Sequence, residues 1–177
     1  MRKIVVLAGS PRKNGNTDRL VDSFVKGVGK QNEVEVLSVH DYNVNPCIGC
    51  NSCFSRDRDD CFQDDDMAVI YEKLESADIL VIASPVYFYG VSSQLKAVID
   101  RLHTPKRNSF HIKRLGLILV GAAELPELFD AITTQYQLIL NFFKLDDAGR
   151  VLVHGAKGKG DVREEDLKKA YYFGHSI

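Results

Sequence analysis

The sequence predicts an α/β protein built on a doubly wound parallel sheet. Segments with strand character alternate with segments of helical periodicity along all 177 residues. The run Ile79–Ile82 is continuously apolar, as expected for a strand buried on both faces. A loop rich in Ser, Asn, Gly and Thr joins the first strand to the first helix, where such folds bind ligands. We therefore expect one domain over residues 1–177, long enough to bury roughly 70% of its unfolded surface.

The elements follow in order from this alternation. Short apolar runs predict five strands, at Lys3–Leu7, Glu33–Val39, Asp78–Ala83, Leu115–Val120 and Asp147–Val153. Apolar residues at helical spacing predict helices over Thr17–Lys30, 64–76, Ser92–Leu102, within Glu124–Phe143, and from about 161 to 174.

Local signals mark where these helices begin. Asp64, Asp65 and Asp66 are favoured at a helix start by the macrodipole. Pro126 suits a first helical turn, and Asp161-x-x-Glu164 resembles a capping box. We interpret Asp100-Arg101 as a simple ion pair at the end of its helix.

The first loop, residues 8–17, has the composition of a phosphate site. It offers backbone N–H groups, hydroxyls and positive charge at the start of a helix. It lacks the Gly-Lys-Ser/Thr ending of a nucleoside-triphosphate loop and the Gly-x-Gly-x-x-Gly of a dinucleotide loop. A terminal monophosphate fits better, and the alternative is a polar turn with Asn16 or Thr17 as helix cap. The candidate binding residues are Ser10, Arg12, Asn14, Gly15, Asn16 and Thr17.

A second loop, after the third expected strand, carries three consecutive aromatic residues. A flat ring could lie against these side chains while backbone N–H groups bond its heteroatoms. The alternative is that the aromatics cover the core or form a subunit interface. A phosphate loop opposite a ring-binding loop points to flavin mononucleotide (FMN). The candidate ring contacts are Pro85, Val86, Tyr87, Phe88, Tyr89 and Gly90.

The four cysteines lie together in a long excursion at about 40–63. Three thiols at two-residue gaps can wrap one corner of a cubane cluster, and a fourth can close the site. A zinc site with four thiolates, a reversible disulfide between the first two cysteines and unligated thiols remain alternatives. The candidate metal ligands are Cys47, Cys50, Cys53 and Cys61.

The composition indicates which classes of partner are not expected. The formal net charge is −1, which gives no general attraction for nucleic acid or an anionic membrane surface. No apolar run approaches the ~20 residues of a membrane span, and the chain enters a strand without a secretory apolar region. We therefore expect a cytoplasmic protein whose thiols remain reduced.

These motifs together resemble a known family. Gly-Ser-Pro-Arg-x-Asn-Gly-Asn-Thr, Cys-x2-Cys-x2-Cys with a fourth Cys, Asp-Asp-Met, and Ser-Pro-Val-Tyr followed by Leu-Lys-x-x-Ile-Asp-Arg are similar to those of NAD(P)H-dependent FMN reductase-like flavoproteins. The cysteines resemble those of the iron–sulfur flavoprotein branch. The resemblance implies a flavodoxin-like fold of strand order 2-1-3-4-5 with helices on both faces, non-covalent FMN, and a homodimer or homotetramer with the flavin near the subunit interface. It also implies that the four cysteines hold a [4Fe-4S] cluster, if one is present.

The functional expectation is an oxidoreductase in which FMN passes electrons from NAD(P)H or a protein donor to a small-molecule or protein acceptor. One alternative is a non-enzymatic, flavodoxin-like electron carrier, although such carriers are typically strongly acidic and this chain is not. Another is a zinc- or thiol-based redox sensor on the same fold. The five histidines are scattered and suggest no catalytic group.

Overall fold

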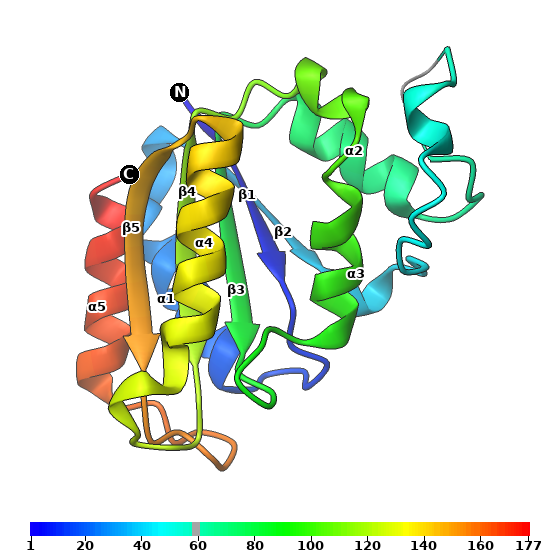
Figure 1. Ribbon diagram of the computed structural model, residues 1–177. Coiled ribbons are helices and arrows are strands. Elements are labelled where there is room, and N and C mark those ends of the chain that lie inside the picture. Colours follow the sequence, from blue (N-terminus) through cyan, green and yellow to red (C-terminus); the bar gives the residue numbers. More distant parts are fainter. Residues whose placement is uncertain (58–60) are drawn as a thin grey trace.

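The computed structural model describes residues 1–57 and 61–177 and contains a five-stranded parallel sheet (Figure 1). The strand order is β2-β1-β3-β4-β5, with every neighbouring pair parallel, which confirms the predicted topology. The strands are β1 Lys3–Ala8, β2 Glu33–Ser38, β3 Ile79–Pro85, β4 Arg114–Val120 and β5 Asp146–Val153.

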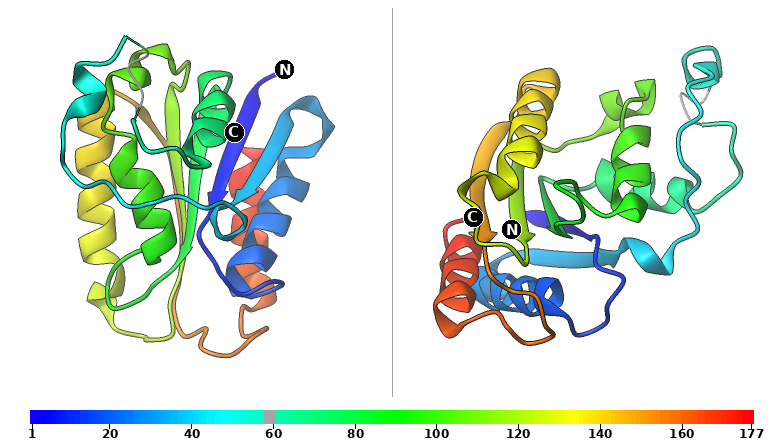
Figure 2. Two further views of the ribbon diagram at one scale, coloured as in Figure 1. Left: turned by 90° about the vertical axis from the view of Figure 1, so that its right-hand side faces the viewer. Right: turned by 60° about the horizontal axis from the view of Figure 1, so that its bottom comes forward.

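Helices cover both faces of the sheet, in two separate layers (Figures 1 and 2). One layer holds α1 and α5, and the other holds α2, α3 and α4. The helices are α1 Asn16–Val28, α2 Met67–Glu75, α3 Ser93–Arg101, α4 Asp130–Phe143 and α5 Glu164–His175.

The central strands alternate their side chains between two apolar cores. In β1, Ile4 and Val6 pack in the core under α1 and α5, while Val5 and Leu7 pack in the core under the other three helices. All four side chains are fully buried. Burial on both faces explains why these strands are continuously apolar in sequence.

Two glycines let α1 and α5 approach closely. A Cβ added to Gly27 would lie 1.9 Å from the carbonyl oxygen of Tyr171, and one added to Gly174 would lie 2.1 Å from that of Phe24. Phe24 and Phe173 fill the space beside this crossing, with ring centroids 5.2 Å apart. The layer behind the first loop is therefore tightly packed.

Two helix starts differ from the expected ones. Pro126 lies in a separate 3-10 turn, Pro126–Phe129, and α4 begins only at Asp130. At the start of α5 the Asp166 carboxylate accepts the backbone N–H of the N-cap residue Arg163, and Asp161 and Glu164 form no capping box. The prediction for α5 was wrong because Asp161 uses its carboxylate within its own turn, accepting a hydrogen bond from the backbone N–H of Gly158.

Among the helices that the structure describes, none combines the length and apolar character needed to cross a membrane.

Candidate functional site

The loops that follow β1, β3, β4 and β5 lie together at the carboxyl edge of the sheet, at the bottom of Figure 1 and turned forward in Figure 2. Backbone hydrogen bonds tie them to one another. Gly9 donates to the carbonyl of Ala83 at the end of β3, at 2.7 Å, and Val86 donates to that of Val120 at the end of β4. Gly121 in turn donates to Val153 at the end of β5. These four loops therefore converge on one edge of the sheet.

The first loop folds tightly around Ser10. The buried Ser10 hydroxyl accepts a hydrogen bond from the N–H of Arg12 at 3.2 Å, and Gly15 N–H donates to the Arg12 carbonyl. Asn14 adopts a left-handed conformation (φ 56°) that turns the chain toward α1. Arg12 and Asn14 are exposed, whereas Thr17 is buried. The result is a compact loop at the N-terminus of α1 with an exposed guanidinium.

Helix α1 is not capped by its own side chains. Its N-cap residue is Gly15, so the alternative that Asn16 or Thr17 caps the helix is wrong. Asn16 instead connects the first loop to the loop after β5. Its Nδ2 donates to the Gly158 carbonyl at 2.8 Å, and its Oδ1 accepts from Gly160 N–H at 2.9 Å. Asn16 therefore fixes the position of the first loop, whether or not it touches a ligand.

The aromatic loop is a tight, exposed hairpin. Tyr87 and Gly90 exchange two backbone hydrogen bonds, and Phe88 and Tyr89 between them both have positive φ, 48° and 64°. Such a conformation costs a non-glycine residue on the order of 1–3 kcal/mol. Phe88 is 98% exposed, so the hairpin does not use this ring to cover the core. That the aromatic side chains form a subunit interface and that they contact a flat ring both stay predictions.

A hollow of about 330 Å³ opens beside the first loop, toward the end of β2. Pro85–Gly90 do not contribute to its lining. The sequence did not single out Asp18, which contributes to this wall. Burial raises the pKa of Asp18, while hydrogen bonds from the backbone of Asn14 and Gly15 oppose that rise. The hollow is lined by Ala8, Ser10, Pro11, Lys13, Asn14, Asp18, Val21, Asp22, Val36, Ser38, His40 and Asp41.

A larger, more apolar cavity of about 510 Å³ lies between α3 and α4, toward the amino end of the strands. Phe110, Phe142 and Phe143 contribute to its wall, together with His103 and Arg107. None of the predicted site residues lines it. This cavity is therefore separate from the carboxyl-edge loops.

The cysteine segment leaves the sheet after β2 and extends to one side of the molecule (Figure 2). Cys47 and Cys50 are exposed, and Cys53 and Cys61 are partly buried. Gly49 and Asn51, between the first three cysteines, both have positive φ, which gives the sharp turns expected there. Within residues 1–57 and 61–177, no group of three ligating side chains is gathered closely enough to hold a metal ion. Part of the excursion, residues 58–60, lies outside the described residues.

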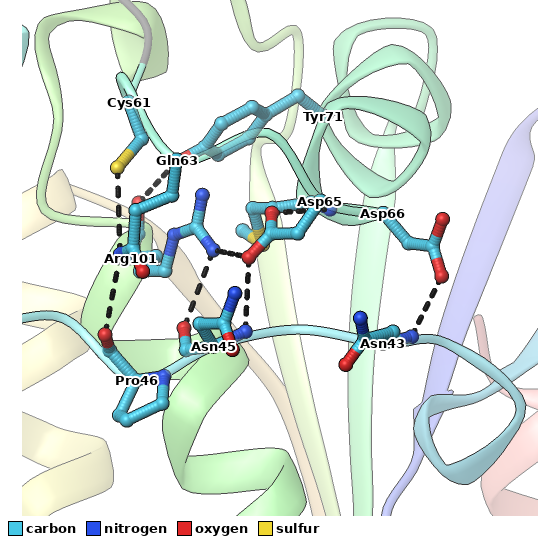
Figure 3. A network of polar contacts seen from close by, with 10 residues as sticks. Asn43, Asn45, Pro46, Cys61, Gln63, Asp65, Asp66, Tyr71 and Arg101 are labelled. Carbon is cyan, nitrogen blue, oxygen red and sulfur yellow. Dashed lines mark hydrogen bonds and ion pairs between the residues drawn. The ribbon is translucent and has the colours of Figure 1, made fainter.

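A buried ion pair holds the base of this segment (Figure 3). Arg101 pairs with Asp65, and both side chains are almost inaccessible, at 3% and 0% exposure. Asp100 instead pairs with Lys96 on the surface of α3. The interpretation of Asp100-Arg101 as a helix-end ion pair was therefore wrong, because Arg101 turns inward to a carboxylate 36 residues earlier in the chain.

The electrostatics of this pair are those of a charged, buried contact. Burial raises the pKa of Asp65, but hydrogen bonds from Arg101 and from the backbone of Asn45 and Met67 outweigh it and hold that pKa below the ordinary value. Burial likewise lowers the pKa of Arg101, and Asp65 more than compensates. Arg101 Nε is buried with no hydrogen-bond partner in the described part of the chain. Most buried donors in proteins have a hydrogen-bond partner, so this nitrogen is an exception.

The chain is similar to proteins of a known family over most of its length. Residues 2–146 match the family described as NADPH-dependent FMN reductase. The chain is 38% identical to an iron–sulfur flavoprotein of Methanocaldococcus jannaschii, over 93% of this chain and 89% of that one. It is 33% identical to an iron–sulfur flavoprotein of Archaeoglobus fulgidus, over 99% of this chain and 78% of that one. The chain belongs to the NADPH-dependent FMN reductase family and is a flavin-dependent oxidoreductase, as the motifs predicted.

Solved structures support the same fold. An NAD(P)H:quinone oxidoreductase from Methanothermobacter marburgensis superposes with a TM-score of 0.78 at 14% identity, covering 98% of this chain and 96% of that one. An FMN-dependent NADH-azoreductase from Bacillus anthracis gives a TM-score of 0.68 at 14% identity, covering 99% of this chain and 96% of that one. At these identities the likeness concerns the flavodoxin-like fold alone.

Proposed function

We propose that this protein binds one FMN per chain and uses it to transfer electrons from NAD(P)H or a protein donor to a small-molecule or protein acceptor. The observation that carries the proposal is the first loop. Gly9 ties this loop to β3, and Asn16 ties it to the loop after β5. These contacts fix the backbone of the loop, with the Ser10 hydroxyl and Arg12, at the N-terminus of α1. A fixed set of N–H donors at a helix start suits a dianionic phosphate.

The residues divide between the two ends of the cofactor. Ser10, Arg12 and residues 14–17 would hold the phosphate, and Pro85–Gly90 would contact the ring. Pro85 and Val86 are half-buried and offer a flat apolar surface, while the hairpin beyond them presents exposed aromatic side chains. Bound FMN would supply hydride and single-electron chemistry. The chain's own contribution is to orient the ring and to exclude water from one side of it.

The cysteine segment fits a [4Fe-4S] cluster in the chemistry of its donors. Four thiols lie within fifteen residues, and the positive φ of Gly49 and Asn51 permits wrapping. The Cys50 thiol has its pKa lowered by a hydrogen bond with Ser52, which favours the thiolate that iron requires. We propose Cys47, Cys50, Cys53 and Cys61 as the ligands.

The proposal includes a cytoplasmic homodimer or homotetramer of single-domain chains. The 98% exposure of Phe88 in a strained hairpin supports a surface that a second chain would cover beside the flavin.

The test is the visible spectrum of protein purified without oxygen, followed by NAD(P)H oxidation with a quinone or ferricyanide acceptor. We expect flavin bands and a broad iron–sulfur absorbance that bleaches on reduction, together with steady-state turnover. Flavin without turnover would indicate an electron carrier. Zinc in place of iron and sulfide, with no flavin after reconstitution, would overturn the proposal.

A further inference from the structure

The chain enters and leaves the cysteine segment side by side, and polar contacts around the buried Asp65–Arg101 pair hold the two arms together. The entering arm contains Asn43, Asn45 and Pro46, and the leaving arm begins at Cys61 (Figure 3). In Figure 3, Arg101 of α3 lies between the two arms. We call Gln63, Asp65, Asp66 and Arg101 the clamp.

Each member of the clamp reaches across to the entering arm. Asp65 Oδ2 accepts the N–H of Asn45 at 2.9 Å, and Asp66 Oδ2 accepts that of Asn43 at 2.6 Å. Arg101 Nη1 donates to the Asn45 carbonyl at 3.2 Å while it pairs with Asp65. The entering arm is thus held through its backbone on both sides of Asn45, so its course does not depend on its own side chains.

Gln63 extends the clamp to the cysteines themselves. Its Nε2 donates to the Pro46 carbonyl at 3.2 Å and lies 3.7 Å from the sulfur of Cys61. Pro46 immediately precedes Cys47. One amide group therefore contacts the residue before the first thiol and the sulfur of the last.

Helix packing makes the clamp rigid. Tyr71 of α2 donates its hydroxyl to the carbonyl of Arg101 at 2.6 Å in a buried contact, and Asp65 Oδ1 accepts the N–H of Met67 at the start of α2. The clamp is thus fixed to both α2 and α3. By contrast, Cys50 and Cys53 lie on the part of the segment that has no clamp contact among the described residues.

Building on the proposed function, we infer that the Asp65–Arg101 pair and Gln63 are positioning residues that preset Cys47 and Cys61 side by side for one shared metal group. Cluster binding then needs only that Cys50 and Cys53 approach this pair. The Asp65–Arg101 pair adds little to the free energy of folding, because removing two charges from water costs about as much as their attraction contributes. A role in placing ligands accounts for a pair that adds little stability.

The first test measures the two arms without any cofactor. In the full chain carrying Cys50→Ser and Cys53→Ser, a short thiol-bridging reagent such as dibromobimane reports how often Cys47 and Cys61 meet. We expect Asp65→Asn to slow intramolecular bridging at least five-fold. Asp100→Asn is the matched control, because it removes a carboxylate from the surface pair with Lys96 one residue away from Arg101, and it should leave the rate unchanged.

The second test uses the four-cysteine protein after anaerobic reconstitution with iron and sulfide. We expect Asp65→Asn to release iron at least three-fold faster than Asp100→Asn, with FMN per chain equal in both. Gln63→Ala removes a partly exposed member of the clamp, so it provides a variant that folds should Asp65→Asn not do so. We expect it to slow bridging and to speed iron release, each by less than Asp65→Asn does.

Equal bridging rates in Asp65→Asn and Asp100→Asn would overturn the inference. So would a bridging rate in Gln63→Ala equal to that of the parent chain carrying only Cys50→Ser and Cys53→Ser. Wild-type protein that binds FMN but no iron would remove the cluster from the proposed function, and the bridging comparison would still decide the role of the clamp.

Discussion

At the scale of single residues, Arg12 is the side chain on which phosphate binding should depend most directly. It is exposed at the start of α1, in a loop whose backbone is already fixed. A hydrogen bond to a charged group is worth about 1.5–3 kcal/mol, so Arg12→Ala should weaken FMN binding by roughly 10- to 100-fold. Fluorescence titration of the flavin-free protein measures this. Lys13→Ala is the control, since Lys13 faces Asp41 at 3.7 Å. Wild-type FMN affinity in Arg12→Ala would remove Arg12 from the site.

The Asp65 carboxylate should make stability depend on pH in a defined direction. Its pKa is held below the ordinary value of 3.8 in the folded protein. A lowered pKa contributes stability that is fully present above the unfolded-state pKa and is lost as the pH falls through the folded-state value. The gap in free energy of unfolding between wild type and Asp65→Asn should therefore be constant near neutral pH and narrow below about pH 4. Urea titrations of the metal-free protein at several pH values measure it; a gap independent of pH would mean that folding does not lower the pKa of Asp65.

The position of the first loop was predictable because its chemistry is local in sequence. The hydroxyls, amides and charge of residues 10–17 are contiguous, so the loop could be recognised without a structure. The Arg101–Asp65 pair could not be predicted, because its two residues are 36 positions apart and Asp100 offered a partner nearer in the sequence. The same limit applies to Asn16, whose partners lie more than 140 residues away in the loop after β5.

At the scale of elements, the close crossing of α1 and α5 yields a stability prediction. Gly27→Ala would gain about 1 kcal/mol of helix propensity, but its Cβ would lie 1.9 Å from the Tyr171 carbonyl oxygen, and backbone atoms cannot yield as a side chain can. We expect a net loss of about 1–3 kcal/mol in the free energy of unfolding. Lys26→Ala, on the exposed face of the same helix, should change it by less than about 0.5 kcal/mol. Urea denaturation compares them, and a neutral Gly27→Ala would show that the helices are not in contact there.

The order of the elements was predictable because burial on both faces leaves a continuous apolar run that helices interrupt at regular intervals. Helix starts were less predictable. Asp161 and Glu164 have the spacing of a capping box, yet the backbone of Gly158 competes for the Asp161 carboxylate. A capping pattern identifies candidates, and the geometry of the preceding turn decides among them.

At the scale of the whole molecule, association of chains and flavin binding should be linked through Phe88. The ring is 98% exposed at the tip of a hairpin on the sheet edge that carries the proposed flavin site. If a second chain covers it, wild-type protein should have twice or four times the 19.8 kDa mass of one chain. Asn tolerates a left-handed backbone, so Phe88→Asn removes the ring without adding strain to the turn.

We expect light scattering to show that Phe88→Asn raises the dimer dissociation constant at least about five-fold, because losing an aromatic anchor costs more than about 1 kcal/mol. Tyr172→Asn removes an aromatic that is 66% exposed on α5 and is the matched control. Where the partner chain completes the flavin site, FMN affinity in Phe88→Asn should recover as protein concentration rises, because mass action restores the dimer. Weaker FMN binding that is independent of protein concentration would assign Phe88 to the flavin of its own chain, and wild-type association in both variants would exclude the hairpin from the interface.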